Sequence, residues 1–141
     1  MRMLITGGLV ARADGVFNTD ILIEDDRILE LGERLHEVPQ PNGTEIVDVS
    51  GYVVMPGGID AHTHVNLTAG GAHVSDGFEA GTLAAAWGGT TTIVEHPGFG
   101  PQGCDLPHQF TVYLEQADGR CHTDYALHGV FQHVDDDVLA R

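Results

Sequence analysis

The feature that most restricts the fold is an alternation of strand and helix patterns that begins near residue 55. Apolar or β-branched segments at residues 59–65, 90–95 and 125–131 are separated by helical patterns at residues 77–87 and 106–118. Strands joined by helical crossovers run parallel in one sheet. Only three such units begin within the 141 residues, whereas a closed (β/α) barrel needs at least ~200. The pattern therefore predicts an α/β fold, either a small open sheet or the front part of a longer barrel, and we favour the barrel.

Residues 1–54 carry a different pattern, made of short strands without a helical period. Residues 21–23 and 28–32 flank an acidic turn at residues 24–27, which predicts a β-hairpin. We therefore expect a portion made of short strands over residues 1–54 and the first part of a barrel over residues 55–141.

Polar residues predict where the helices of the second part begin. Asp76 and Glu79 have the spacing of a capping box, so Asp76 is expected to cap the first helix. Asp105 is expected to cap the second helix. The Gly-rich residues 66–74 predict a loop before the first helix.

Charge and hydropathy exclude several classes of partner. The chain has 6 basic residues, all Arg, and 21 acidic residues, for a net charge of −15. Such an anionic surface does not favour nucleic acid or an anionic membrane. No segment approaches the ~20 apolar residues of a membrane span, and the first residues lack the apolar core of a secretion signal. These observations predict a cytoplasmic protein without nucleic-acid or membrane partners.

The strongest chemical motif is Asp60-x-His62-x-His64. Residues two apart on a strand point to the same side, so both imidazoles can reach one metal ion. Zinc accepts imidazole nitrogen readily, and catalytic sites combine about three protein ligands with one open position. We expect His62 and His64 to be metal ligands. Asp60, which shares their face, is expected to support a ligand ring through a hydrogen bond.

The sequence around this motif, Pro-Gly-Gly-Ile-Asp-Ala-His-Thr-His, closely resembles the first-strand signature of the cyclic amidohydrolases. This family includes dihydropyrimidinases, hydantoinases, allantoinases and dihydroorotases. Residues 20–32 are similar to the family's N-terminal hairpin, residues 78–94 to its first barrel helix and second strand, and residues 124–128 to its third strand. The resemblance extends over the whole chain and is closest to the dihydropyrimidinase/D-hydantoinase type.

The resemblance implies an N-terminal β-sandwich portion over residues 1–54. It also implies a metal-dependent (β/α)8 TIM barrel, of which residues 55–141 are the first part and which binds two divalent metal ions, most commonly zinc. A metal-bridging hydroxide would open a cyclic amide or ureide, such as a dihydropyrimidine or hydantoin ring, to an N-carbamoyl amino acid. In the family a carboxylated Lys bridges the metals, and two later His and a general-base Asp complete the set. This chain contains no Lys, so the bridging Lys and the Asp are expected beyond Arg141. We accordingly expect the 141 residues alone to be inactive, and the resemblance implies a homotetramer.

The residues after the motif separate members of the family. Dihydroorotases typically have an Arg where this chain has Asn66, which disfavours a dihydroorotase. The Gly70–Gly71 stretch resembles the loop of dihydropyrimidinases and hydantoinases that lines the substrate's exocyclic group, and Asn66, Gly70 and Gly71 are expected to be the substrate-loop residues. The alternatives are an allantoinase or another cyclic-amide hydrolase of the superfamily, a non-catalytic scaffold protein of the same fold, and a small metal-binding module. His96 is interpreted as a solvated strand-end histidine, with a pocket-lining role as the alternative. His128 is interpreted as a hydrogen-bonded barrel residue rather than a ligand.

Overall fold

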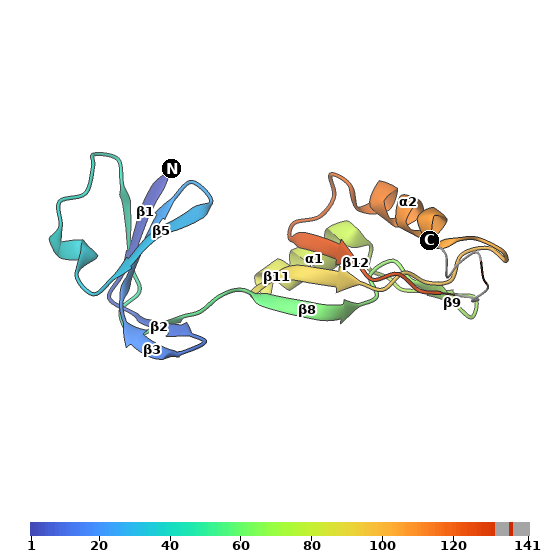
Figure 1. Ribbon diagram of the computed structural model, residues 1–141, viewed down its shortest axis with the longest axis horizontal. Coiled ribbons are helices and arrows are strands. Elements are labelled where there is room, and N and C mark those ends of the chain that lie inside the picture. The colour runs from blue at the N-terminus through green and yellow to red at the C-terminus, as the bar shows by residue number, and fades with distance from the viewer. Residues whose placement is uncertain (132–135, 137–141) are drawn as a thin grey trace. The chain divides into compact units, whose positions relative to one another are not determined.

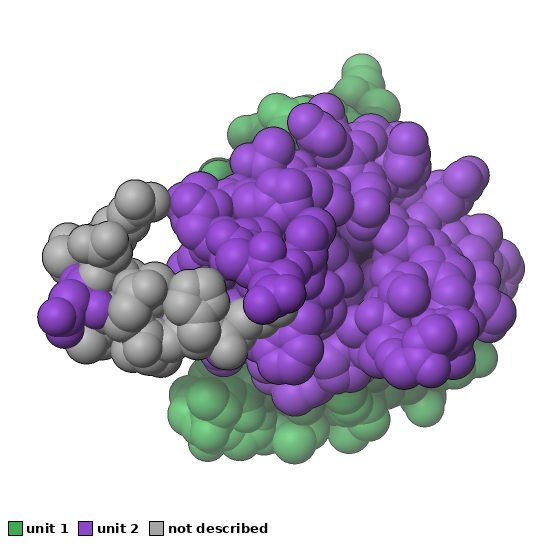
Figure 2. All heavy atoms as spheres, turned by 90° about the vertical axis from the view of Figure 1, so that its right-hand side faces the viewer, with its two compact units in different colours: residues 1–56 green, residues 57–141 purple. Residues whose placement is uncertain are grey.

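The computed structural model describes residues 1–131 and residue 136, and the chain divides into two compact units (Figure 1). The first unit comprises residues 1–56 and the second residues 57–141; Figure 2 colours them separately. Within the described part of the chain, no helix is long and apolar enough to cross a membrane.

The first unit consists of two small sheets. One has the strand order β5-β4-β1-β6, and the other has the order β3-β2-β7. The first sheet contains β1 (Arg2–Thr6), β4 (Asp20–Glu24), β5 (Arg27–Gly32) and β6 (Glu45–Asp48). The second contains β2 (Leu9–Arg12), β3 (Gly15–Asn18) and β7 (Val53–Val54). The antiparallel pairing of β4 with β5 confirms the predicted hairpin. Strand β3 was not predicted.

Three leucines form the core of this unit. Leu4 on β1 lies opposite Leu22 on β4, so both side chains project from the same face of the sheet. Leu35, in the short 3-10 helix η1 (Leu35–Glu37), packs against both. This helix lies in the segment that connects β5 to β6.

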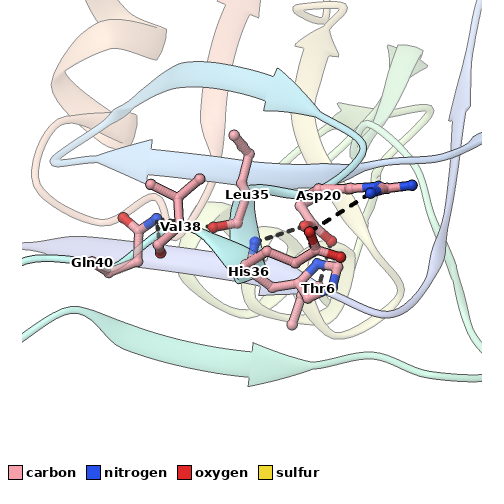
Figure 3. Close-up of polar contacts among 8 residues, drawn as sticks. Thr6, Asp20, Leu35, His36, Val38 and Gln40 are labelled. Carbon is pink, nitrogen blue, oxygen red and sulfur yellow. Dashed lines mark hydrogen bonds and ion pairs between the residues drawn. The ribbon is translucent and has the colours of Figure 1, made fainter.

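A buried carboxylate holds η1 on the sheet. Asp20 is only 2% exposed and lies between Thr6 and His36 (Figure 3). The Thr6 hydroxyl donates to Oδ1 at 2.7 Å, and the His36 backbone N–H donates to Oδ2 at 3.0 Å. The His36 ring nitrogen Nδ1 lies 2.6 Å from the same Oδ2. Burial opposes ionisation of Asp20, but the hydrogen bonds from Thr6 and His36 outweigh it and lower the pKa.

The second unit is built on a parallel sheet with the order β12-β11-β8. Its strands are β8 (Gly58–Thr63), β11 (Thr90–Glu95) and β12 (Asp124–Leu127), connected through α1 (Phe78–Trp87) and α2 (Leu106–Ala117). Phe78 of α1 packs with Tyr113 and Ala117 of α2. Tyr125 and Leu127, which alternate on β12, pack against the same cluster. Both helices therefore cover one face of the sheet. The parallel pairing of its strands confirms the prediction from the strand–helix alternation.

The pairing of β8 with β11 contains two register irregularities. Thr90 pairs with Gly58 and Thr92 with Ile59, so β11 has one additional residue there. A second irregularity lies between the pairs Ile93–Asp60 and Glu95–Thr63, where β8 has the additional residue. The two offsets cancel, and the second one coincides with the histidine motif.

The predicted N-terminal capping residue is confirmed for α2 but not for α1. Asp105 caps α2, because its carboxylate accepts the backbone N–H of His108 at 3.0 Å. The predicted Asp76 capping box at α1 is wrong. The N-cap is Gly77, and no side chain caps this end. The Asp76 carboxylate instead accepts the Ser75 hydroxyl, and its carbonyl accepts the backbone N–H of Asn66.

Candidate metal centre

The end of β8 brings two imidazole rings together. The Nε2 atoms of His62 and His64 lie 3.1 Å apart, and the ring planes are inclined at 72°. Two nitrogen ligands at ~2.0–2.1 Å from one tetrahedral ion are separated by about 3.3 Å. The spacing of the two nitrogens therefore fits a shared metal ion. Ligation itself remains a prediction.

The backbone carbonyl of the residue that follows β11 selects the tautomer of His64. The Nδ1 atom of His64 lies 3.0 Å from the carbonyl oxygen of His96. A carbonyl only accepts hydrogen bonds, so Nδ1 carries the proton and the lone pair is on Nε2. This is the nitrogen that faces His62, and a lone pair there is what a metal ligand requires.

Two further histidines extend the group across the sheet. The His96 ring stacks on His62 with centroids 3.7 Å apart and planes 12° apart. His128, which follows β12, lies 4.3 Å from His96 between ring centroids. We call His62, His64, His96 and His128 the histidine row. It follows the C-terminal ends of three adjacent parallel strands, the edge at which (β/α) barrels place their active sites.

The row also changes the protonation of His62. Desolvation lowers the pKa of its imidazole, and the neighbouring His96, His64 and His128 lower it further, while Asp60 opposes the shift. A lowered pKa favours the neutral ring, which is the form that binds a metal.

Asp60 makes a backbone contact at the start of the motif. Its Oδ1 accepts the backbone N–H of His62 at 3.2 Å. The partner that the structure gives to the second ring nitrogen of His64 is the His96 carbonyl rather than Asp60. Asp60 thus holds the backbone of the motif through its hydrogen bond with His62. Its expected hydrogen bond to a ligand ring stays a prediction.

A buried carboxylate supports the motif from the other face of the sheet. Glu95 is 0% exposed, and its Oε2 accepts the Thr63 hydroxyl at 2.8 Å and the Val65 N–H at 2.9 Å. Within the described residues, Oε1 has no hydrogen-bond partner. Burial raises the pKa of Glu95, and the hydrogen bonds with Val65 and Thr63 partly offset that rise. Sequence reasoning missed this residue, because a Glu at the end of a β-branched strand gives no sign of burial.

The loop residues expected near substrate form a small hairpin. Strands β9 (Thr68–Ala69) and β10 (Ala72–His73) pair antiparallel. Gly70 and Gly71 form the turn with φ of 59° and 81°, which favour glycine. Asn66 has φ of 79°, and its amide Nδ2 donates to Gln116 Oε1 at 2.5 Å. A cavity of about 170 Å³ adjoins this hairpin, and Asn66, Thr68, Gly98, Tyr113 and Gln116 are among its lining residues.

The described residues provide only part of a metal site. Among residues 1–131 and 136, no group of three or more His, Cys, Asp or Glu side chains is placed to hold a metal ion. The donor set is thus the imidazole pair of His62 and His64. Two ligands leave a metal short of the usual three protein ligands of a catalytic zinc site.

Hydantoinases and a dihydropyrimidinase are among the known proteins to which this chain is similar. A D-phenylhydantoinase from Escherichia coli O1:K1 is 46% identical over 139 residues, which are 99% of this chain and 30% of that protein. The D-phenylhydantoinase of E. coli O139:H28 is 48% identical over 139 residues, which again are 99% of this chain and 30% of that protein. Dihydropyrimidinase from Brevibacillus agri NCHU1002 superposes with a TM-score of 0.91 at 36% identity, covering 99% of this chain and 29% of that structure. The chain spans about 30% of the length of the curated relatives that it matches.

A search of protein-family models gave no match. The similarity to hydantoinases nevertheless extends over almost the whole chain, in sequence and in structure. It confirms the resemblance identified from the histidine motif and the expected α/β architecture.

Proposed function

The chain belongs to the dihydropyrimidinase/D-hydantoinase type of cyclic amidohydrolases, and we propose that it forms the N-terminal part of a metal-dependent hydrolase that opens cyclic amides. Its substrates would be small cyclic amides or ureides, such as dihydropyrimidine or hydantoin rings, and its products N-carbamoyl amino acids. The observation that carries this proposal is the 3.1 Å separation of the His62 and His64 Nε2 atoms. It occurs within a chain 46% identical to a D-phenylhydantoinase.

His62 and His64 would hold the metal through Nε2, with the His96 carbonyl keeping the proton of His64 on Nδ1. A bound divalent ion supplies two effects, a lower pKa for its water and polarisation of the amide carbonyl. We infer two ions, most consistently zinc because the donors are imidazoles. The bridging Lys, the remaining His ligands and the general-base Asp would come from sequence beyond residue 141.

The remaining assignments are also proposals. Residues 1–54 would belong to the β-sandwich and residues 55–141 to the barrel. Asn66, Gly70 and Gly71 would lie beside the exocyclic group of the substrate. The intact protein would assemble as a homotetramer of identical subunits.

The test is ring opening by the full-length protein. The purified zinc-loaded protein should hydrolyse hydantoin or dihydrouracil, and a chelator should abolish that activity until zinc is restored. Hydrolysis of allantoin in preference to both would favour the allantoinase alternative. A protein that binds zinc without opening any of the three rings would favour a scaffold.

A further inference from the structure

The residue after β11 contacts both imidazoles of the pair. The His96 ring stacks on the His62 ring at 3.7 Å between centroids. The His96 carbonyl accepts the Nδ1 proton of His64 at 3.0 Å. The His96 backbone N–H donates to the Thr63 carbonyl at 2.9 Å, which joins the two strand ends between the two ligands.

The His96 ring is itself held in place. Its Nε2 lies 3.3 Å from the carbonyl oxygen of Ala61. Because a carbonyl can only accept, this nitrogen carries a proton and its lone pair is unavailable to a metal. His128 contacts the His96 ring at 4.3 Å between centroids. These contacts favour a supporting role for His96 over a role as a third ligand.

His62 and His64 depend on His96 in different ways. The His64 ring is oriented by a hydrogen bond to the backbone, which survives any substitution at position 96. For His62, no hydrogen bond to ring atom Nδ1 is present within residues 1–131 and 136, and the stacked His96 ring covers one of its faces. The plane of the His62 ring is therefore set largely by packing against the side chain of His96.

We propose that His96 is the positioning residue of the metal pair, and that its imidazole fixes the ring plane in which His62 presents Nε2. The proposal rests on the proposed function, because it assumes that the pair binds a metal. It deepens that function by naming a residue beyond the ligands on which metal affinity depends.

The experiment measures the zinc dissociation constant of the full-length protein by chelator competition, with thermal unfolding as a check on folding. His96→Ala removes the stacked ring, and His96→Phe keeps an aromatic surface of similar size without the hydrogen bond to Ala61. His122→Ala is the matched control, since His122 is an exposed histidine of the same unit that precedes β12 instead of following it. All measurements start from metal-free protein.

Loss of a group that orients a metal ligand typically weakens metal affinity about 10–100-fold, and we expect that loss in His96→Ala. His96→Phe should stay within about threefold of the wild type, and His122→Ala should be unchanged. A His96→Ala protein within about twofold of the wild type, or a His96→Phe protein as weak as His96→Ala, overturns the positioning role alone. A wild-type protein without zinc affinity overturns the proposed function as well, so the two failures are distinguishable.

Discussion

The carboxylate of Glu95 accepts the backbone N–H of Val65, the residue directly after His64, at 2.9 Å. The same oxygen accepts the hydroxyl of Thr63, the residue directly before His64. A fully buried acidic side chain thus holds the residues on both sides of one candidate ligand, Thr63 through its hydroxyl and Val65 through its backbone. His96, the next residue along the chain, contacts the two imidazoles on the other face of the sheet.

Glu95→Ala should destabilise the second unit by about 1–3 kcal/mol, because the buried donors of Thr63 and Val65 would lose their acceptor. Glu95→Gln should retain most of the stability, since its amide oxygen can accept both hydrogen bonds. Urea unfolding of the metal-free protein measures the difference. Equal losses in the two variants would contradict the role given to these hydrogen bonds.

His62→Ala and His64→Ala should each abolish stoichiometric zinc binding and metal-dependent turnover. Both side chains are exposed, so the unfolding free energy should change by no more than about 0.5 kcal/mol. Metal content of the dialysed protein and its thermal midpoint are the two measurements. His73→Ala, an exposed histidine on β10, is the control and should retain its metal. Full zinc occupancy in His62→Ala would exclude this residue as a ligand.

Asp20 predicts a pH dependence in the first unit. Its folded pKa is lowered from 3.8, so its ionised form stabilises the fold above the unfolded pKa. That stabilisation should be lost as the pH falls from about 4 through the lowered folded pKa. Asp20→Asn should remove this dependence and cost about 1–3 kcal/mol at neutral pH.

Acid titration of stability at pH 2–6 (a window of about two pH units on either side of the ordinary pKa) measures the effect of Asp20→Asn. Asp26→Asn is the control, because Asp26 is an exposed turn residue in a loose 3.6 Å pair with exposed Arg27. An unchanged acid dependence in Asp20→Asn would show that other carboxylates control the transition.

The two glycines before the histidine motif should respond differently to a methyl group. A Cβ at Gly57 would overlap the Thr91 side chain, including its Cβ at 2.8 Å. A Cβ at Gly58 would meet nothing closer than Thr90 Oγ1 at 3.4 Å. Gly57→Ala should therefore destabilise the protein by about 1–3 kcal/mol, with a smaller loss for Gly58→Ala. Thermal unfolding of both variants is the test, and the reverse order would refute it.

The polypeptide of residues 1–141 should be catalytically silent when produced alone. It contains two expected ligands and no Lys, and β8 and β12 each pair with only one neighbour in the described sheet. Unpaired strand edges promote association, so light scattering should detect oligomers or aggregates. Turnover of hydantoin above background with added zinc would contradict this prediction.

Some local features of the fold were predictable from the sequence, and others were not. The hairpin of β4 and β5 follows from two segments rich in Ile and Leu around an acidic turn, and the cap of α2 follows from Asp105. Asp76 has an equally good capping pattern, but its side chain and carbonyl bind Ser75 and Asn66. Such competition depends on tertiary contacts, which a local pattern does not contain.

The sequence was enough to predict how the site residues lie along one strand. It was not enough to predict the contacts between residues on different strands. Alternation along β8 is enough to place His62 beside His64. The contact of His62 with His96 depends on the register of β8 against β11, and that register shifts twice. The identity of Glu95 as a buried anchor likewise depends on which face of β11 the helices cover.

The paired register shifts determine where this chain tolerates changes in length. The additional residue of β11 and the additional residue of β8 compensate each other. The two strands are therefore back in their original register where Glu95 pairs with Thr63. A single-residue deletion in either strand would rotate the following side chains to the opposite face and separate the histidines from their neighbours. Insertions at the Gly70–Gly71 turn leave both strands in phase. Variation in length should therefore accumulate at that turn and be rare within β8 and β11.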